Sequence, residues 1–371
     1  MAKEVIFFSR FVLDEESGGG CRREAQLGEV LHPLDYEFRS WRNSRSWFKN
    51  QMSGKQRLLF QVEKRILPYR KYWDDFYIDQ MIKMKAVTRG WKKNLGKNKN
   101  LKLVIIDDPL YFYPLVEYLH KRDIPMVGLC QNIESLSYSQ LKSARQLELF
   151  NKEINLFKKC RLVVTISREE TFLLKNFNIP AYYLPYYPVQ SIEQRMINIR
   201  EKRKKTGKEG FLVIGTAWNK VTLVGMQALI DSWAGDLNKC PQEKLLVAGF
   251  GTTRLIKEVK SKNIEYLGEV SNQELDDIFT RIKAMICYQE YGSGALTKIA
   301  EMLIAGVPVL ANSHAARSYH EFKRVIEFPG LEGLGDAVVK LEALEKTPDS
   351  WENIPVKPSC RGLIEQIRAL I

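Results

Sequence analysis

Short apolar runs recur along the first half of the chain, separated by longer stretches with the apolar spacing of helices. These runs lie at 5–8, 103–106, 126–130, 162–166 and 182–184. Each has the length of a strand and ends in small or polar residues. Strands that alternate with helices predict right-handed βαβ units and a parallel sheet.

A second series of the same kind begins at residue 211. Its apolar runs lie at 212–214, 245–248, 265–267, 284–288 and 307–311. Between the two series the apolar pattern fades into the charged sequence IEQRMINIREKRKKTGKEG, which is typical of an exposed linker. The predicted fold class is therefore α/β, with two Rossmann-like, doubly wound domains that face each other across a ligand cleft. We expect domains at 1–188 and 211–355, with a linker at 189–210. Residues 356–371 are expected to form a C-terminal helix, and one possible arrangement is that it packs back on the first domain.

Several predicted strands end in residues suited to ligand contact, because ligands bind outside the carboxyl ends of strands in open parallel sheets. Asp107 and Asp108 follow one strand and either touch substrate or cap the next helix. Gln131 follows another. In the second half the strand ends carry glycines, at Gly215, Gly249 and Gly251.

The most informative stretch is RIKAMICYQEYGSGALTKIAEMLIAGVPVLA, residues 281–311. It predicts a strand, a glycine turn at Gly292, Ser293 and Gly294, a helix, and a further strand. A helix that begins after small residues offers free N–H groups and a positive dipole end to an anion, such as a nucleotide diphosphate.

Lys298 and Glu301 lie three residues apart and share a face of that helix. The lysine is suited to neutralise phosphate charge, and the glutamate to accept hydrogen bonds from a ribose. The alternative is an ordinary glycine turn beside a surface salt bridge, because short glycine motifs have low specificity.

Composition agrees with two globular domains. The 371 residues are 45% hydrophobic and 27% charged, without a low-complexity tract. No apolar run has the length of a transmembrane helix, and the amino terminus lacks a signal-peptide pattern. The six cysteines are scattered and the four histidines lack metal-ligand spacing, so we expect a reducing cytoplasm, no structural metal and no cofactor.

The net charge of +13 is concentrated in one segment. Residues 39–102 hold 18 Lys and Arg against four Asp and Glu, a net charge of +14, interleaved with aromatic residues. This mixture favours an anionic membrane surface, with Arg42, Arg45, Trp47 and Lys49 as candidate contacts. Nucleic-acid binding and a solvated basic face over core aromatics remain alternatives.

Four motifs in the second half resemble a known family. The order AGFG (248–251), YLGEVSNQELDDIF (266–279), GSGALTKIAE (292–301) and AGVPVLA (305–311) is similar to the carboxyl half of retaining glycosyltransferases of the B fold, often called family 4. The amino half is similar over QNIESLSYSQL (131–141), CRLVVTISREETFLL (160–174) and YYLPYYP (182–188).

The resemblance implies metal-independent transfer of a sugar from a UDP- or GDP-linked donor, with retention of anomeric configuration. By position, loop 292–294 and Lys298 hold the diphosphate, Glu301 binds the ribose, and backbone contacts near Glu269 and Val270 select the base. Gly18, Gly19 and Gly20 match the family's glycine-rich first loop, which approaches the acceptor and the donor phosphates.

Three positions depart from the usual pattern. Ser293 replaces an acidic residue, as in a subgroup written G-x-G-x-x-x-K-x-x-E. Gln131 replaces a histidine that faces the donor sugar; it retains a binding role but has no proton to transfer. In the segment after the first strand of the second domain, Lys220 is the only cation available to grip the diphosphate.

Together these features predict a retaining transferase at the inner face of the membrane that modifies a lipid-linked or polysaccharide acceptor in cell-surface glycan synthesis. One alternative is a sugar-nucleotide epimerase, which needs acid and base residues that the sequence does not obviously provide. The other is a catalytically degenerate scaffold that binds nucleic acid or a partner through the basic segment.

Overall fold

The computed structural model describes residues 4–11, 13, 18–40, 91–92, 95–138, 146–235, 243–257, 261–345 and 353–371. The chain divides into two compact units. The first unit comprises Met1–Pro185 and Pro358–Ile371, and the second comprises Tyr186–Lys357. Within the described residues no helix is both long and apolar enough to cross a membrane.

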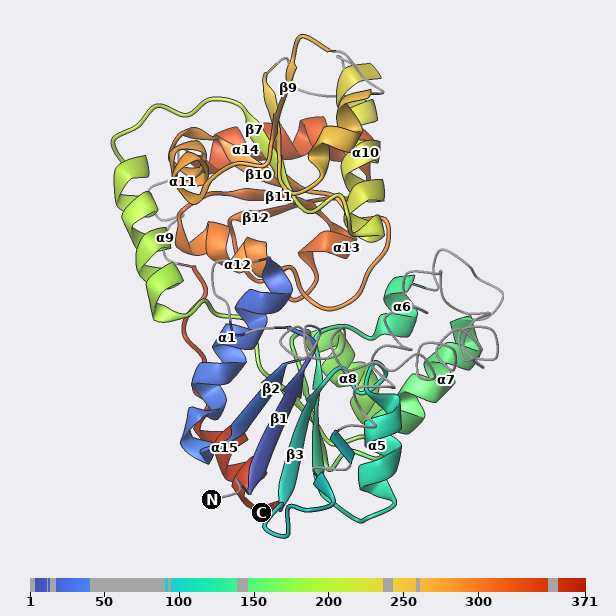
Figure 1. Ribbon diagram of the computed structural model, residues 1–371. Coiled ribbons are helices and arrows are strands. Elements are labelled where there is room, and N and C mark those ends of the chain that lie inside the picture. The colour runs from blue at the N-terminus through green and yellow to red at the C-terminus, as the bar shows by residue number, and fades with distance from the viewer. Residues whose placement is uncertain are drawn as a thin grey trace, which may run out of the picture. The chain divides into compact units, whose positions relative to one another are not determined.

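The first unit contains a six-stranded parallel sheet in the order β2-β1-β3-β4-β5-β6 (Figure 1). Its strands are β1 (Val5–Ser9), β2 (Glu37–Ser40), β3 (Leu103–Asp107), β4 (Met126–Cys130), β5 (Leu162–Thr165) and β6 (Ala181–Tyr183). Its helices are α1 (Gly19–Leu31), η1 (His32–Leu34), α5 (Tyr113–His120), α6 (Glu134–Tyr138), α7 (Gln146–Phe157), α8 (Arg168–Asn176) and α15 (Arg361–Arg368). The chain reverses its direction of winding between the neighbouring strands β1 and β3.

Alternate residues of β1 enter two different cores. Val5 and Phe7 pack with α1 and α15, whereas Ile6 and Phe8 pack with α5, α7 and α8. The strand is buried on both faces, as expected for a parallel sheet covered by helices on each side. The C-terminal helix α15 therefore completes the core of the first unit, through Leu363, Ile364 and Ile367.

The second unit contains another six-stranded parallel sheet, in the order β12-β11-β10-β7-β8-β9. Its strands are β7 (Phe211–Ile214), β8 (Leu245–Ala248), β9 (Ile264–Gly268), β10 (Ala284–Cys287), β11 (Val309–Asn312) and β12 (Val325–Phe328). Its helices are α9 (Gln190–Arg203), α10 (Lys220–Gly235), η4 (Thr252–Lys257), α11 (Asn272–Arg281), α12 (Thr297–Ile304), α13 (Ser313–Ala316), η5 (Leu331–Gly333) and α14 (Leu334–Glu345). Residues of α10 and α14 share a core with the sheet. Here the winding reverses between β7 and β10.

The predicted fold class of two doubly wound parallel-sheet units is confirmed. Two edge strands, β2 and β12, were not predicted. β2 has a polar sequence, EFRS, and among the described strands it pairs with β1 alone. β12 alternates buried and less buried positions and, within the same described residues, pairs with β11 alone, so neither has the continuous apolar run of a central strand.

The segment expected as a linker instead forms α9, which packs against α11 and α12. Ile192, Met196 and Ile199 recur at helical spacing and are buried. Arg203 is also buried and donates to the carbonyl oxygens of Gly306 at 3.1 Å, Ile282 at 2.9 Å and Phe279. The abundance of charged residues concealed this narrow apolar stripe.

Candidate functional site

In the second unit, the glycines predicted to lie near a ligand come together at the carboxyl ends of β7, β8 and β10. Gly249, with φ of 122°, lies so close to β7 that a Cβ atom would be 2.0 Å from the Gly215 oxygen. No side chain fits in that space. These strand ends include the point between β7 and β10 where the winding reverses, which is where open α/β sheets bind ligands.

The loop formed by Gly292, Ser293 and Gly294 connects β10 to α12. Gly292 has φ of 127° and Gly294 has φ of 74°, both in the region that favours glycine. The predicted order of strand, glycine turn, helix and strand is confirmed by β10, this loop, α12 and β11. The N-cap residue of α12, Leu296, makes no side-chain cap, and anion binding at this helix end stays a prediction.

Two side chains after β11 contact this loop from one side. Arg317 Nε donates to Gly294 O at 2.7 Å, and its Nη2 donates to Ser293 O at 3.0 Å. His314 Nε2 lies 3.0 Å from Gly292 O. Burial, with a smaller contribution from Arg317, lowers the pKa of His314, so near neutral pH its imidazole is uncharged.

Lys298 and Glu301 both extend from α12 to fixed partners within the second unit. Lys298 Nζ donates to the Ile214 oxygen, at the end of β7, at 2.6 Å. This contact places the ammonium group beside the glycine-lined strand ends. Glu301 is buried, and its Oε1 accepts a hydrogen bond from Tyr186 Oη at 2.7 Å.

The remaining predicted donor residues lie on nearby loops of this unit. Lys220 is exposed in the first turn of α10. Glu269 is exposed after β9, where its Oε1 accepts from the Gly251 N–H at 3.4 Å, and Val270 directly precedes the N-cap of α11. Next to Gly251, the guanidinium carbon of Arg254 lies 3.4 Å from the ring centroid of Trp218, whose side chain is exposed.

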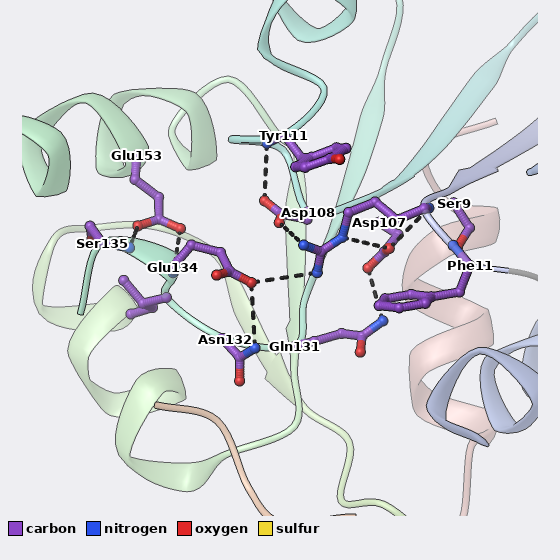
Figure 2. Close-up of polar contacts among 12 residues, drawn as sticks. Ser9, Phe11, Asp107, Asp108, Tyr111, Gln131, Asn132, Glu134, Ser135 and Glu153 are labelled. Carbon is purple, nitrogen blue, oxygen red and sulfur yellow. Dashed lines mark hydrogen bonds and ion pairs between the residues drawn. The ribbon is translucent and has the colours of Figure 1, made fainter. Parts of the chain in front are cut away.

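The first unit carries a second polar cluster, at the carboxyl ends of β1, β3 and β4. The carboxyl groups of Asp107, Asp108 and Glu134 converge there (Figure 2). Arg10 lies among them, with nitrogen–oxygen distances of 3.5, 3.0 and 3.5 Å to Asp107, Asp108 and Glu134. Asp108 has a φ of 54°, and its Oδ1 accepts from the Tyr111 N–H at 3.1 Å, so it both faces the cluster and caps the following turn.

Gln131 connects two carboxylates of this cluster. Its Nε2 donates to Glu24 Oε1 at 2.7 Å and to Asp107 Oδ1 at 3.0 Å. The amide thus contacts acidic side chains of its own unit, and a donor-sugar contact by Gln131 stays a prediction. Glu24, Asp107 and Gln131 come from α1, β3 and the end of β4, so the contacts join three elements.

Burial makes ionisation of these acidic side chains less favourable. It raises the pKa of Glu24 well above its usual value, and the nearby Asp107 raises it further. Burial also raises the pKa of Asp107, and that of Glu134 to about 7, although the positive charge of Arg10 acts in the opposite direction on both. The cluster can therefore hold and release protons near neutral pH, a property that the sequence did not reveal.

The expected glycine-rich first loop is different in the structure. Gly18 is the N-cap of α1, and Gly19 and Gly20 are its first two residues, so the cluster begins a helix. Glycine gives little support to a helix interior, but it is tolerated at the N-cap and in the first turn.

Two further expectations concern the membrane and metals. Arg42, Arg45, Trp47 and Lys49 lie outside the described residues, as does most of the basic segment 39–102. In the part of the chain that the structure describes, no group of three or more His, Cys, Asp or Glu side chains is placed to hold a metal ion.

Comparison with solved structures identifies the fold. The chain is similar to α,α-trehalose 6-phosphate synthase from Burkholderia multivorans, with a TM-score of 0.60, 10% identity, and coverage of 100% of this chain and 99% of the other. It is also similar to Anabaena Alr3699/HepE in complex with UDP and glucose, with a TM-score of 0.58, 12% identity and 99% coverage of both chains. The fold is the glycosyltransferase B fold.

The same fold also occurs in a protein of a different activity. UDP-GlcNAc 2-epimerase from Methanocaldococcus jannaschii, in complex with UDP-GlcNAc and UDP, matches with a TM-score of 0.54 and 14% identity over 98% of this chain and 99% of the other. No protein-family model matches the sequence, and a search of curated proteins finds no match. The shared fold alone therefore does not assign the reaction.

Arg10, Arg317 and Gln289 have central positions in the two clusters, but none of them was predicted as a site residue. Arg10 lies 97 residues before Asp107, and Arg317 lies 23 residues after Gly294. No sequence motif links the two residues of either pair. The only available signal was their location shortly after predicted strands.

Proposed function

We propose that the protein is a glycosyltransferase that uses a UDP- or GDP-linked sugar and transfers the sugar to a glycan or lipid-linked acceptor. The observation that supports this most strongly is the loop 292–294 at the amino end of α12, with Lys298 beside it. The similarity to proteins that bind UDP, or are named as sugar-phosphate synthases, agrees with this proposal.

In the proposed reaction, the bond between the anomeric carbon and the diphosphate breaks. Negative charge grows on the departing diphosphate, and groups fixed in advance beside that charge lower the barrier. The N–H groups of the loop and of the first turn of α12, together with the Lys298 ammonium, supply this stabilisation. We propose that Lys220 adds a second cation and that Glu301 binds the ribose through its carboxylate.

We further propose retention of configuration without a metal ion, with the leaving phosphate taking the proton of the acceptor hydroxyl. No carboxylate nucleophile is then required, in contrast to retaining glycoside hydrolases. The acceptor is proposed to bind the first unit, where the carboxyl and amide groups around Arg10 suit the hydroxyl groups of a sugar.

Nucleotide binding to full-length protein tests the proposal. Thermal shift with UDP, GDP and dTDP should show stabilisation by one of them, of about 2.7 kcal/mol at a ligand concentration one hundred times the Kd. Lys298→Ala and Glu301→Ala should remove most of that stabilisation, whereas Lys283→Ala, at the opposite end of β10, should not. No response to any nucleotide, together with tight, salt-sensitive RNA binding, would favour the scaffold alternative.

A second candidate, a sugar-nucleotide epimerase, is favoured by one observation. Glu134, Asp107 and Glu24 are buried acids with raised pKa values, so the acid and base groups that the sequence did not obviously provide are present in the first unit. Such groups could remove a proton from a sugar carbon and return it.

Isotope exchange distinguishes the two reactions. The protein is incubated in D2O with UDP-GlcNAc and with UDP-glucose, without acceptor, and the sugar nucleotides are examined by mass spectrometry. A transferase leaves the carbon-bound hydrogens unchanged and turns the donor over faster when acceptor is added. Deuterium on a sugar carbon, lost in Glu134→Gln, would instead assign an epimerase.

A further inference from the structure

The side chains that contact loop 292–294 hold three consecutive carbonyl groups. Gly292 O meets His314 Nε2 at 3.0 Å, Ser293 O accepts from Arg317 Nη2 at 3.0 Å, and Gly294 O accepts from Arg317 Nε at 2.7 Å. Because the carbonyl oxygens only accept, His314 must carry its proton on Nε2.

The direction of these carbonyls fixes the direction of the neighbouring N–H groups. In a trans peptide, the C=O of one residue and the N–H of the next point in opposite directions, and no described peptide bond is cis. The N–H groups of Ser293, Gly294 and Ala295 therefore point away from Arg317 and His314. Successive N–H groups that share one side form a concavity for an anion.

Arg317 is itself held in place by Gln289, which follows β10, and by His314 of α13. Its Nη2 lies 3.3 Å from Gln289 Oε1, and its Nη1 donates to the His314 oxygen. Asn312 fixes the main chain of Gln289, because its Oδ1 accepts from the Gln289 N–H at 3.0 Å and its Nδ2 donates to the Gln289 oxygen at 2.7 Å. Together with the contacts to the loop, these hydrogen bonds engage all three nitrogens of the guanidinium and hold it beside the loop.

The charge of Arg317 adds to its geometric effect. A guanidinium that binds a carbonyl oxygen polarises the peptide, and the N–H on the opposite side becomes a stronger donor. A neutral side chain of similar length provides hydrogen bonds without this polarisation. A lysine restores the charge but not the planar, branched arrangement of donors.

We propose that Arg317 is a positioning residue for the donor diphosphate, with His314 as its second anchor. Arg317 acts through the loop, turning three amides toward the phosphates, and does not need to touch the ligand. The inference rests on the proposed function, since it assumes that a nucleoside diphosphate binds at loop 292–294.

The test compares two ligands in four variants of the full chain. Titration calorimetry measures the Kd of the nucleoside diphosphate that stabilises the wild type best, and NMR titration measures that of the corresponding nucleoside. Arg317→Gln should weaken diphosphate binding by about tenfold or more and leave nucleoside binding within about twofold. Arg317→Lys should recover part of the loss, and His314→Ala should produce a smaller loss of the same kind.

Arg203→Gln is the matched control. Arg203 is buried and also donates to carbonyl oxygens. These include Ile282 O, which precedes β10, and Gly306 O, which precedes β11, so they lie at the other end of the sheet. Its replacement should lower the melting temperature without changing the ratio of diphosphate to nucleoside affinity.

Two results would overturn the inference: a wild-type affinity of Arg317→Gln for the diphosphate, or an equal loss of affinity for the diphosphate and the nucleoside. If Arg317→Gln does not fold, Arg317→Lys and His314→Ala decide between the same outcomes. A wild-type protein that binds no nucleoside diphosphate would instead refute the proposed function itself.

Discussion

At the scale of single residues, Glu134 gives the second polar cluster a measurable dependence on pH. Burial raises its pKa to about 7 in the folded protein, from an ordinary value of 4.5. The folded state thus binds the Glu134 proton more tightly than the unfolded state does. The stability associated with this proton is complete below pH 4.5 and is lost as pH rises through 7.

We expect Glu134→Gln to flatten this part of the stability profile. Glutamine resembles the protonated acid and does not titrate. The free energy of unfolding of the variant, relative to that of the wild type, should therefore rise between pH 5 and 8. The gain is at most about 3 kcal/mol. Urea unfolding at both pH values measures it, and Glu148→Gln, in an exposed pair with Lys152 on α7, is the control. If the free energy of unfolding of Glu134→Gln falls with pH as steeply as that of the wild type, Glu134 is not the group responsible for this pH dependence.

The placement of residues could be predicted where it followed from spacing along one stretch of the chain. Lys298 and the glycines of 292–294 lie near one another along the chain, and the expected anion-binding arrangement needs only a loop and the helix after it. Arg10 and Arg317 contact residues that are distant in the sequence, so their placement depends on how the sheet brings separate segments together.

At the scale of elements, the sequence was most informative about central strands. β3, β4, β8 and β10 are buried along their whole length, and such strands appear in a sequence as uninterrupted apolar runs. In the part of the chain that the structure describes, the edge strands β2 and β12 have a neighbouring strand on one side only, which leaves room for polar residues. Their sequences therefore resemble those of loops.

Helix α9 shows a different limit of pattern reading. Its buried positions form a stripe about one residue wide, and the rest of its surface is charged. Hydropathy averaged over a window of neighbouring residues reflects only the abundance of charged residues. The structure assigns this helix to the second unit. There Arg203 donates hydrogen bonds to the carbonyl oxygens of Phe279, near the end of α11, and of Gly306, after α12.

At the scale of the whole molecule, the two units share one architecture but differ in the chemistry at their strand ends. The second unit presents backbone amides, Lys298 and Lys220 at the carboxyl ends of its strands, which favours an anionic ligand. The first unit presents the carboxyl groups of Asp107, Asp108 and Glu134 around Arg10, an excess of acidic groups that disfavours phosphate and suits hydroxyl groups. This division matches a reaction between a nucleotide sugar and a neutral glycan acceptor.

The distribution of charge leads to a prediction about location. Residues 39–102 carry a net charge of +14 and the rest of the chain is close to neutral, and aromatic residues lie between the basic ones in this segment. We expect the protein to bind vesicles that contain anionic lipid and to be released by salt, because each lysine or arginine near such a surface contributes about 1 kcal/mol.

Flotation with phosphatidylserine-containing vesicles measures this binding, with phosphatidylcholine vesicles as the lipid control. Reversing Arg42, Arg45 and Lys49 to glutamate removes three attractions of about 1 kcal/mol each and adds repulsion, so the partition coefficient should fall at least about a hundredfold. The matched control reverses Lys202, Lys204 and Lys205, at and just beyond the end of α9, and changes the net charge by the same amount. Equal losses in both triple variants would indicate that net charge alone attracts the protein to the membrane, and unchanged flotation of the first would exclude the basic segment as the contact surface.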